Sequence, residues 1–281
     1  MSAGKHAAGW MAYEAGYAFD AKLEALGRGT AQARPLLWFG LFEQAERLDA
    51  AAFATLLPDE AGAWIGAARP LVSRAWFDAA FTDVERLISA GDIYQVNLSF
   101  RASVAVLGDP LAVYARLRAN ARAGWGGIVH DGRDWLLSLS PETFFRTDGS
   151  RIEARPMKGT AARSEDPRED EALAAALAAD PKQRAENLMI VDLIRNDLSR
   201  VARPGSVVTP ALFTVEHYPT VHQMVSQVEA QILPGRDAID ILLALFPCGS
   251  ITGAPKLRAM EVIAEVEKDR RGPYTGAIGA L

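Results

Sequence analysis

The stretch "GGIVHDGRDWLLSLSPETFFRTDGSRIEARPM" occupies residues 126–157 and indicates the fold class. Apolar runs flank the Asp131-Gly132 pair, and a second set flanks the Asp148-Gly149 pair. An Asp-Gly pair between such runs is a strong signal for a tight hairpin turn, because both turn residues need positive φ. The stretch therefore predicts two successive hairpins, 126–140 and 142–157, and antiparallel pairing.

Helical patterns lie on both sides of these hairpins. Residues 109–122 begin with an Asp N-cap and a Pro at the first helical position. Residues 76–92 carry apolar side chains at helical spacing, and residues 185–202 present a wide apolar face. Residues 93–106 alternate in part and predict one strand. Because helices do not alternate strictly with strands, the pattern predicts an α+β fold rather than a doubly wound sheet.

The composition is that of an ordinary folded protein. The chain has 281 residues, 49% of them hydrophobic, and a formal net charge of −5. A negative net charge disfavours a dedicated nucleic-acid binder, which usually carries a basic excess. No apolar run approaches the ~20 residues of a membrane span, and the start has no long apolar segment, so we expect neither a membrane span nor a signal peptide. The single cysteine, Cys248, excludes an intrachain disulfide and is compatible with the cytoplasm.

Lys158 stands out in "RPMKGT" (155–160) because an apolar residue precedes it and a Gly-Thr pair follows it. One interpretation is a lysine that extends along apolar surface to water. The other is a partly desolvated lysine, whose free amine is available as a nucleophile. Gly159 would let the backbone approach a ligand, and Thr160 would offer a hydroxyl group.

Two glutamates have the same ambiguity. Glu142 in "SPETFFR" is either a turn residue facing solvent or a partly desolvated carboxyl group suited to general-acid chemistry. Glu186 lies on the helix predicted for 185–202, where salt bridges explain most of the polar side chains. A single glutamate can also bind Mg²⁺ together with waters and an anionic substrate.

The segment "PCGSITGAPKLRAM" (247–260) places small residues before a helix that opens at Ala254-Pro255. Backbone N–H groups at such a helix start favour a carboxylate, and Ser250 and Thr252 would add hydroxyl groups. The order of residues is not that of a phosphate-binding P-loop, and no histidine or cysteine cluster has zinc spacing. His222, on a predicted strand, is more often structural than catalytic when taken alone.

Taken together, seven ordered segments resemble the chorismate-utilising enzymes, a family that includes anthranilate, aminodeoxychorismate, isochorismate and salicylate synthases. The segments are "GDIYQVNLSF", "SPETFF", "RPMKGT", "RAENLMIVDLIRND", "PTVHQMVSQV", "FPCGSITGAPKLRAMEVI" and "GPYTGAIG". The resemblance implies a catalytic domain over residues 76–281, with residues 1–75 forming a shortened N-terminal part of the sandwich. It also implies a two-lobed α+β fold, with antiparallel sheets packed face to face and helices outside.

The resemblance implies a reaction for Lys158. Aminodeoxychorismate synthases carry lysine at this place in the motif, whereas anthranilate synthases carry alanine. The lysine amine would attack C2 of chorismate as the C4 hydroxyl leaves. Ammonia would then add at C4 and expel the lysine, giving 4-amino-4-deoxychorismate, a precursor of 4-aminobenzoate and folate.

The resemblance also implies roles for other side chains. Glu142 would protonate the leaving hydroxyl, and Glu186 would bind Mg²⁺, which holds the ring carboxylate. The expected substrate-binding residues are Gln95, Thr160, His222, Ser250, Thr252, Gly253 and Tyr274. Ammonia would come from a separate glutamine amidotransferase subunit in the cytoplasm.

The family continues past "GAIGAL", with a tail that should carry an arginine, a second metal-binding glutamate and a lysine. We therefore expect little activity from this chain alone. Two alternatives stay open: an anthranilate synthase component, and an inactive chorismate-binding paralogue or fragment.

Overall fold

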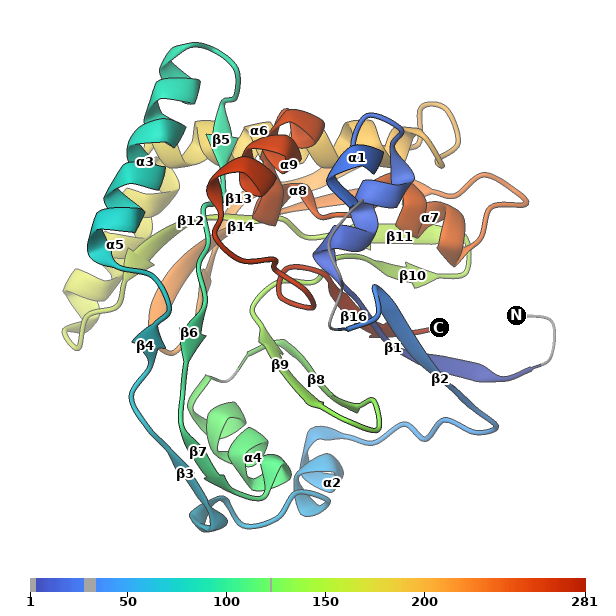
Figure 1. Ribbon diagram of the computed structural model, residues 1–281. Coiled ribbons are helices and arrows are strands. Elements are labelled where there is room, and N and C mark those ends of the chain that lie inside the picture. Colours follow the sequence, from blue (N-terminus) through green and yellow to red (C-terminus); the bar gives the residue numbers. More distant parts are fainter. Residues whose placement is uncertain (1–3, 28–33, 122) are drawn as a thin grey trace. The chain divides into compact units, whose positions relative to one another are not determined.

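The structure is a computed structural model that describes residues 4–27, 34–121 and 123–281 (Figure 1). Its contacts group the chain into two compact units, each built from separate stretches of sequence. Unit 1 comprises Met1–Arg86, Leu98–Pro141 and Ala264–Leu281, and unit 2 comprises Leu87–Asn97 and Glu142–Ile263. The predicted domain boundary at residue 75 falls in the first turn of α3 (Arg74–Ser89). That division of the chain stays a prediction.

The sheet of unit 2 is built around one long strand, β14 (Val221–Gln231). β11 (Arg151–Ala154) and β12 (Met157–Ala162) pair with successive parts of one edge of β14. β13 (Val208–His217) pairs with the other edge, and β10 (Arg146–Asp148) extends the sheet beyond β11. All of these pairs are antiparallel, as the Asp-Gly hairpin signal predicts for β10 and β11.

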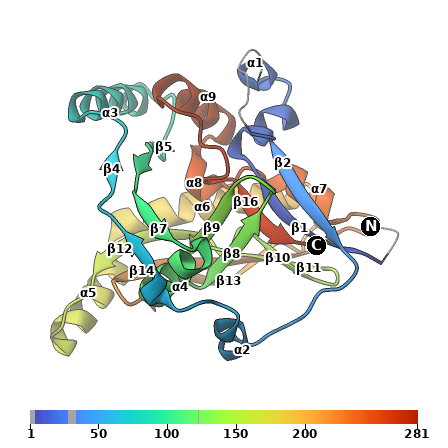
Figure 2. The same ribbon diagram turned by 60° about the horizontal axis from the view of Figure 1, so that its bottom comes forward.

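Helix α6 (Pro181–Ser199) lies across β12 and β14 (Figures 1 and 2). It begins where it does because Asp180 caps its first turn and Pro181 occupies the first helical position. Its fully buried Ile190 and Leu198 enter the core of the unit, which also contains Ile152 and Val228 of the sheet. The remaining helices of this region are α5 (Pro167–Ala179), α7 (Ala238–Leu245), α8 (Gly249–Thr252) and α9 (Lys256–Val266).

Unit 1 contains small antiparallel sheets and short helices. A three-stranded sheet has the order β16-β1-β2, and β8 and β9 form a hairpin beside α4 (Figure 2). The strands are β1 (His6–Met11), β2 (Leu37–Phe42), β3 (Ala63–Ile65), β4 (Arg69–Pro70), β6 (Ala102–Ser103), β7 (Val106–Gly108), β8 (Trp125–His130), β9 (Trp135–Ser140) and β16 (Ala277–Ala280). The helices are the 3₁₀ helices η1 (Tyr13–Phe19) and η2 (Glu60–Gly62), with α1 (Glu24–Gly27), α2 (Ala50–Thr55) and α4 (Pro110–Ala121). No helix of the described residues is long and apolar enough to cross a membrane.

The predicted α+β class, both hairpins and the helices α3 and α4 are confirmed. Residue 122, at the end of the predicted helix 109–122, lies outside the described residues. The single strand predicted for residues 93–106 is wrong. Three separate pieces of this segment pair with different partners: β5 (Gln95–Val96) with β15 (Gly253–Ala254), β6 with β4, and β7 with β3. Local alternation cannot reveal such a change of partner, because each partner comes from a distant part of the chain.

A buried ion pair joins α9 to α6. The Lys256 ammonium contacts the Asp197 carboxylate, and the two side chains are 11% and 9% exposed. The same Nζ donates to the carbonyl oxygen of Leu245 at 2.8 Å, at the end of α7. Burial raises the pKa of Asp197, which Lys256 partly offsets. The pair therefore ties three helices together at the cost of desolvating two charges.

Replacing Lys256 with Met leaves the Asp197 carboxylate buried without a cation, and we expect a loss of about 3 kcal/mol in the free energy of unfolding. The loss is larger at about pH 8 than at about pH 5, because protonation of Asp197 at the lower pH removes the unpaired charge. Urea unfolding measures both values. The double variant Lys256→Met with Asp197→Leu should recover most of the loss, and an equal loss in both variants would contradict this role.

Candidate active site

Lys158 lies in an irregular part of β12. Met157 pairs with Val225 and Thr160 with Gln223, so the register shifts between them and Lys158 falls within the shift. Gly159 has φ +106°, a conformation that side-chain-bearing residues rarely adopt. The Lys158 side chain is partly buried near Glu142, Glu186 and Cys248. Burial lowers the pKa of its ammonium group, although the carboxylates and the thiol oppose that change.

Glu142 is held by a hydrogen bond from α8, the short helix that precedes α9. The Ser250 hydroxyl donates to Glu142 Oε1 at 2.6 Å. Burial raises the pKa of Glu142 to about 7, while the bonds from Ser250 and from the Met157 backbone, with the charge of Lys158, act in the opposite direction. A carboxyl group with this pKa exists in both protonation states near neutral pH, which suits proton transfer.

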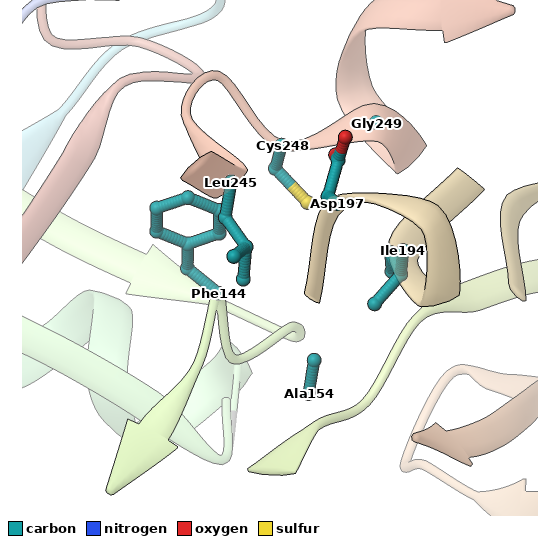
Figure 3. Close-up of a pocket in the computed structure, with 7 residues that line it drawn as sticks. All are labelled: Phe144, Ala154, Ile194, Asp197, Leu245, Cys248 and Gly249. Carbon is teal, nitrogen blue, oxygen red and sulfur yellow. The ribbon is translucent and has the colours of Figure 1, made fainter. Parts of the chain in front are cut away.

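The short helix α8, which carries Ser250, is fixed by its own side chains and by Cys248 before it. Cys248 Sγ lies 3.1 Å from Ser250 Oγ, and the Thr252 hydroxyl donates to the Cys248 carbonyl at 2.8 Å. Burial raises the pKa of the Cys248 thiol to about 11, so this thiol is protonated at neutral pH. A cavity of about 10 Å³ beside it is lined by Phe144, Ala154, Ile194, Asp197, Leu245, Cys248 and Gly249 (Figure 3). This volume is near the minimum for one water molecule, so the cavity is too small for an organic substrate.

Gln95 and Gly253 meet in the short sheet of β5 and β15, where Ala254 pairs with Gln95 and Gly253 with Val96. A Cβ on Gly253 would lie 2.2 Å from the Gln95 carbonyl oxygen, so only glycine fits there. Gln95 Oε1 is buried and has no hydrogen-bond partner within the described chain. An unsatisfied buried acceptor of this kind is available to a ligand that donates a hydrogen bond.

Glu186 projects from the second turn of α6. Its side chain is 38% exposed, and Lys182 Nζ lies 4.0 Å from Oε1. This distance is too long for a strong ion pair, so at least part of the carboxylate remains available to another cation. The neighbouring Asn187 is fully buried and faces the sheet.

Three other predicted site residues form no hydrogen bond with this group in the described part of the chain. His222 is fully buried, with Nε2 2.9 Å from Asp170 Oδ1 and Nδ1 2.8 Å from His217 Nδ1. Thr160 is exposed, and its hydroxyl donates to Gln223 Oε1 at 2.9 Å. Tyr274 belongs to unit 1 and is 58% exposed. Their proposed contacts with a substrate stay predictions.

Asp170, His217 and His222 form the group of potential metal ligands found among the described residues. Both oxygens of Asp170 already accept hydrogen bonds from Arg163, at 2.8 Å each. Arg163 holds the pKa of Asp170 well below its ordinary value. We therefore interpret this group as a hydrogen-bond network around the buried His222 rather than a metal centre. The sequence did not indicate it, because Asp170 lies in a charged helical stretch typical of a solvated surface.

A family model described as chorismate binding enzyme matches residues 2–281. The chain belongs to this family. It is 47% identical over 212 residues to an aminodeoxychorismate synthase component 1 from Salmonella typhimurium, covering 75% of this chain and 46% of that protein. It is 44% identical over 194 residues to an anthranilate synthase component 1 from Thermus thermophilus, covering 69% of this chain and 42% of that protein.

Among solved structures, anthranilate synthase component I from Streptococcus pneumoniae matches with a TM-score of 0.81 and 27% identity, covering 99% of this chain and 69% of that one. The predicted membership in the family of chorismate-utilising enzymes is confirmed. The chain spans about half the length of the curated relatives that it matches.

The raised pKa of Glu142 predicts a pH-dependent stability. Between its ordinary value of 4.5 and the folded value of about 7, the folded state holds a proton that the unfolded chain releases, so stability falls as the pH rises. Glu142→Gln removes this titration and keeps an acceptor for Ser250. We expect the variant to be more stable than the parent at about pH 8, by at most about 3 kcal/mol, and nearly equal at about pH 4.

Urea unfolding at the two pH values measures this difference. Glu85→Gln, at an exposed position of α3, is the control for the same change of charge. A stability difference for Glu142→Gln that does not depend on pH would show that this carboxyl group titrates normally.

Proposed function

We propose that this chain is the chorismate-converting part of an aminodeoxychorismate synthase component 1. The reaction would join chorismate and ammonia to form 4-amino-4-deoxychorismate. The observation that supports this proposal most directly is the partly buried Lys158 amine, which interacts electrostatically with Glu142, a carboxyl group that accepts a hydrogen bond from Ser250 at 2.6 Å. The names of relatives at up to 47% identity agree with it.

Lys158 would act as the nucleophile. Burial favours its neutral amine, which has the lone pair needed to bond to C2 of the ring. Glu142, with a pKa of about 7, would deliver its proton to the C4 hydroxyl as that group leaves. Ammonia would then add at C4, and the bond between Lys158 and C2 would break to restore the amine.

Glu186 fits one position in a Mg²⁺ site. It offers a half-exposed carboxylate near Lys158 that is only loosely paired with Lys182. Mg²⁺ usually binds one or two carboxylates together with waters and substrate oxygens, so a single glutamate is sufficient from this side. The ion would supply positive charge to hold a carboxylate of the dianionic substrate.

A partner subunit would supply the ammonia. The relatives are named component 1, which implies a second component, and we propose that it is a glutamine amidotransferase. The small, partly buried and protonated Cys248 has no role in such chemistry, since a thiol with a pKa of about 11 is a poor nucleophile at neutral pH.

Anthranilate synthase activity is the alternative, because relatives of that name match at 44% identity. That reaction does not need a covalent lysine. The position of Lys158 within hydrogen-bonded and partly desolvated surroundings therefore favours aminodeoxychorismate formation.

Lys158→Ala tests the proposal. In the protein assayed with chorismate, ammonium salt and Mg²⁺, we expect formation of 4-amino-4-deoxychorismate to fall at least roughly 10³-fold, as when a covalent nucleophile is removed. A lyase that releases 4-aminobenzoate allows chromatographic detection, while anthranilate is detected by its own fluorescence. Mass spectrometry of the peptide containing Lys158 should reveal a chorismate adduct in the parent protein, even where turnover is slow. An unchanged rate and product in Lys158→Ala would exclude covalent catalysis.

A further inference from the structure

The two strands that pair with the central strand β14 in its middle part, β12 and β13, both shift register there. On one edge, β12 shifts register between Met157 and Thr160. On the other edge, β13 shifts between Ala211 and Thr214. Both shifts face residues 223–227 of β14, and Lys158 belongs to the first of them. Two bulges opposite the same residues disturb the hydrogen-bond ladder twice in one place.

These bulges require other partners for buried backbone groups. A buried carbonyl or N–H group without a partner costs about 1–3 kcal/mol, so the displaced groups of both strands need new hydrogen bonds. Phe213, in the bulge of β13, has φ +59°, which is uncommon for a residue with a side chain. Such conformations persist only where the surroundings enforce them.

Asn187 of α6 supplies the missing bonds. Its Nδ2 group donates to the carbonyl oxygen of Lys158 at 3.1 Å and to that of Met224 at 3.2 Å. Its Oδ1 accepts from the Ser226 hydroxyl at 2.5 Å. Ser226 Oγ in turn accepts from the backbone N–H of Phe213 at 3.1 Å. The carbonyl oxygens of Lys158 and Met224 can only accept hydrogen bonds, so the Asn187 atom that faces them must be the NH₂ nitrogen. Through this amide and Ser226, one side chain connects both bulges.

The preceding turn of α6 contacts the same two bulges. A Cβ on Gly159 would lie 3.2 Å from Gln183 Oε1 and 3.1 Å from Met224 Cβ, so the helix and the bulge of β12 are closely packed. Arg184 places its guanidinium 4.7 Å from the centre of the Phe213 ring. The start of α6 therefore matches the shape of both irregular strands, with Asn187 as the polar link.

We propose that Asn187, oriented by Ser226, is a positioning residue for Lys158: it holds the bulge that directs the Lys158 side chain toward Glu142 and Glu186. The catalytic meaning of this role rests on the proposed function, in which Lys158 is the nucleophile. The structural reason is the period of a strand. A shift of one residue in pairing moves every side chain to the opposite face, so loss of the bulge would turn Lys158 away from its neighbours.

The test measures the surroundings of Lys158 without any substrate. The protein is acylated with an amine-reactive ester over a range of pH, and peptide mass spectrometry follows the rate at each lysine. The internal reference is Lys182, whose side chain is 81% exposed and which lies on α6, the helix of Asn187. In the parent protein, we expect the half-maximal rate at Lys158 to occur at a lower pH than at Lys182.

Asn187→Ala should move the Lys158 midpoint upward by roughly one pH unit or more, toward that of Lys182, because the amine then reaches water. Ser226→Ala, which removes the hydroxyl that orients the amide, should produce a smaller shift in the same direction. Ser226→Thr keeps the hydroxyl and should behave like the parent. These two variants keep the test valid if Asn187→Ala fails to fold.

Ile190→Val, one turn along α6 in the hydrophobic core, is the control for lost stability, and its Lys158 midpoint should not move. The proposal is overturned if Asn187→Ala or Ser226→Ala loses stability while the Lys158 profile stays that of the parent. It is also overturned if Lys158 and Lys182 have the same profile in the parent protein. If the proposed function is wrong, the Lys158→Ala variant keeps the amination rate of the parent protein. That assay does not depend on the acylation experiment.

Discussion

The site depends on one electrostatic constraint: an amine and a carboxyl group share partly buried surroundings. Burial favours the neutral form of both groups, whereas their mutual attraction favours the charged form of both. The raised pKa of Glu142 and the lowered pKa of Lys158 indicate that burial prevails. The hydrogen bond from Ser250 to the carboxylate partly opposes the rise in the pKa of Glu142. The result is a pair in which burial shifts both groups toward their neutral forms, and their proton assignment belongs to the pair.

Such a pair is useful only if its geometry is rigid, and each partner is held from a different element. Glu142 is fixed by Ser250 of α8, and the following helix α9 is tied to α6 and α7 through Lys256. Lys158 is fixed through its own carbonyl by Asn187. Helix α6 is thus common to both supports. Its hydrophobic face secures it to the sheet, and its polar residues determine how the strands and the loop present their functional groups.

Structural features that depend only on neighbouring residues could be predicted from the sequence. The Asp-Gly turns predicted the hairpins, and the Asp-Pro start predicted α4, because these preferences act over a few residues. Lys158, Glu142 and Ser250 were identified as candidates, and they lie close together. The bulges beside β14 and the contacts of Asn187 were not predictable, since they depend on packing between distant segments. The hydrogen bond of His222 was not predictable for the same reason: its partner Asp170 lies 52 residues away in the sequence.

Overall identity separates the two possible activities poorly. Relatives named aminodeoxychorismate synthase and anthranilate synthase match at 47% and 44%, respectively, so the two identity values are nearly equal. The difference in chemistry has to come from a few atoms beside the substrate. In the proposed mechanism, a lysine without the bulge would face away from the acid, and a bulge without the lysine would have no nucleophile to position. For the proposed function, the connected arrangement of Lys158, Gly159, Asn187 and Ser226 is therefore more informative than the identity value, since the proposed mechanism needs all of its parts.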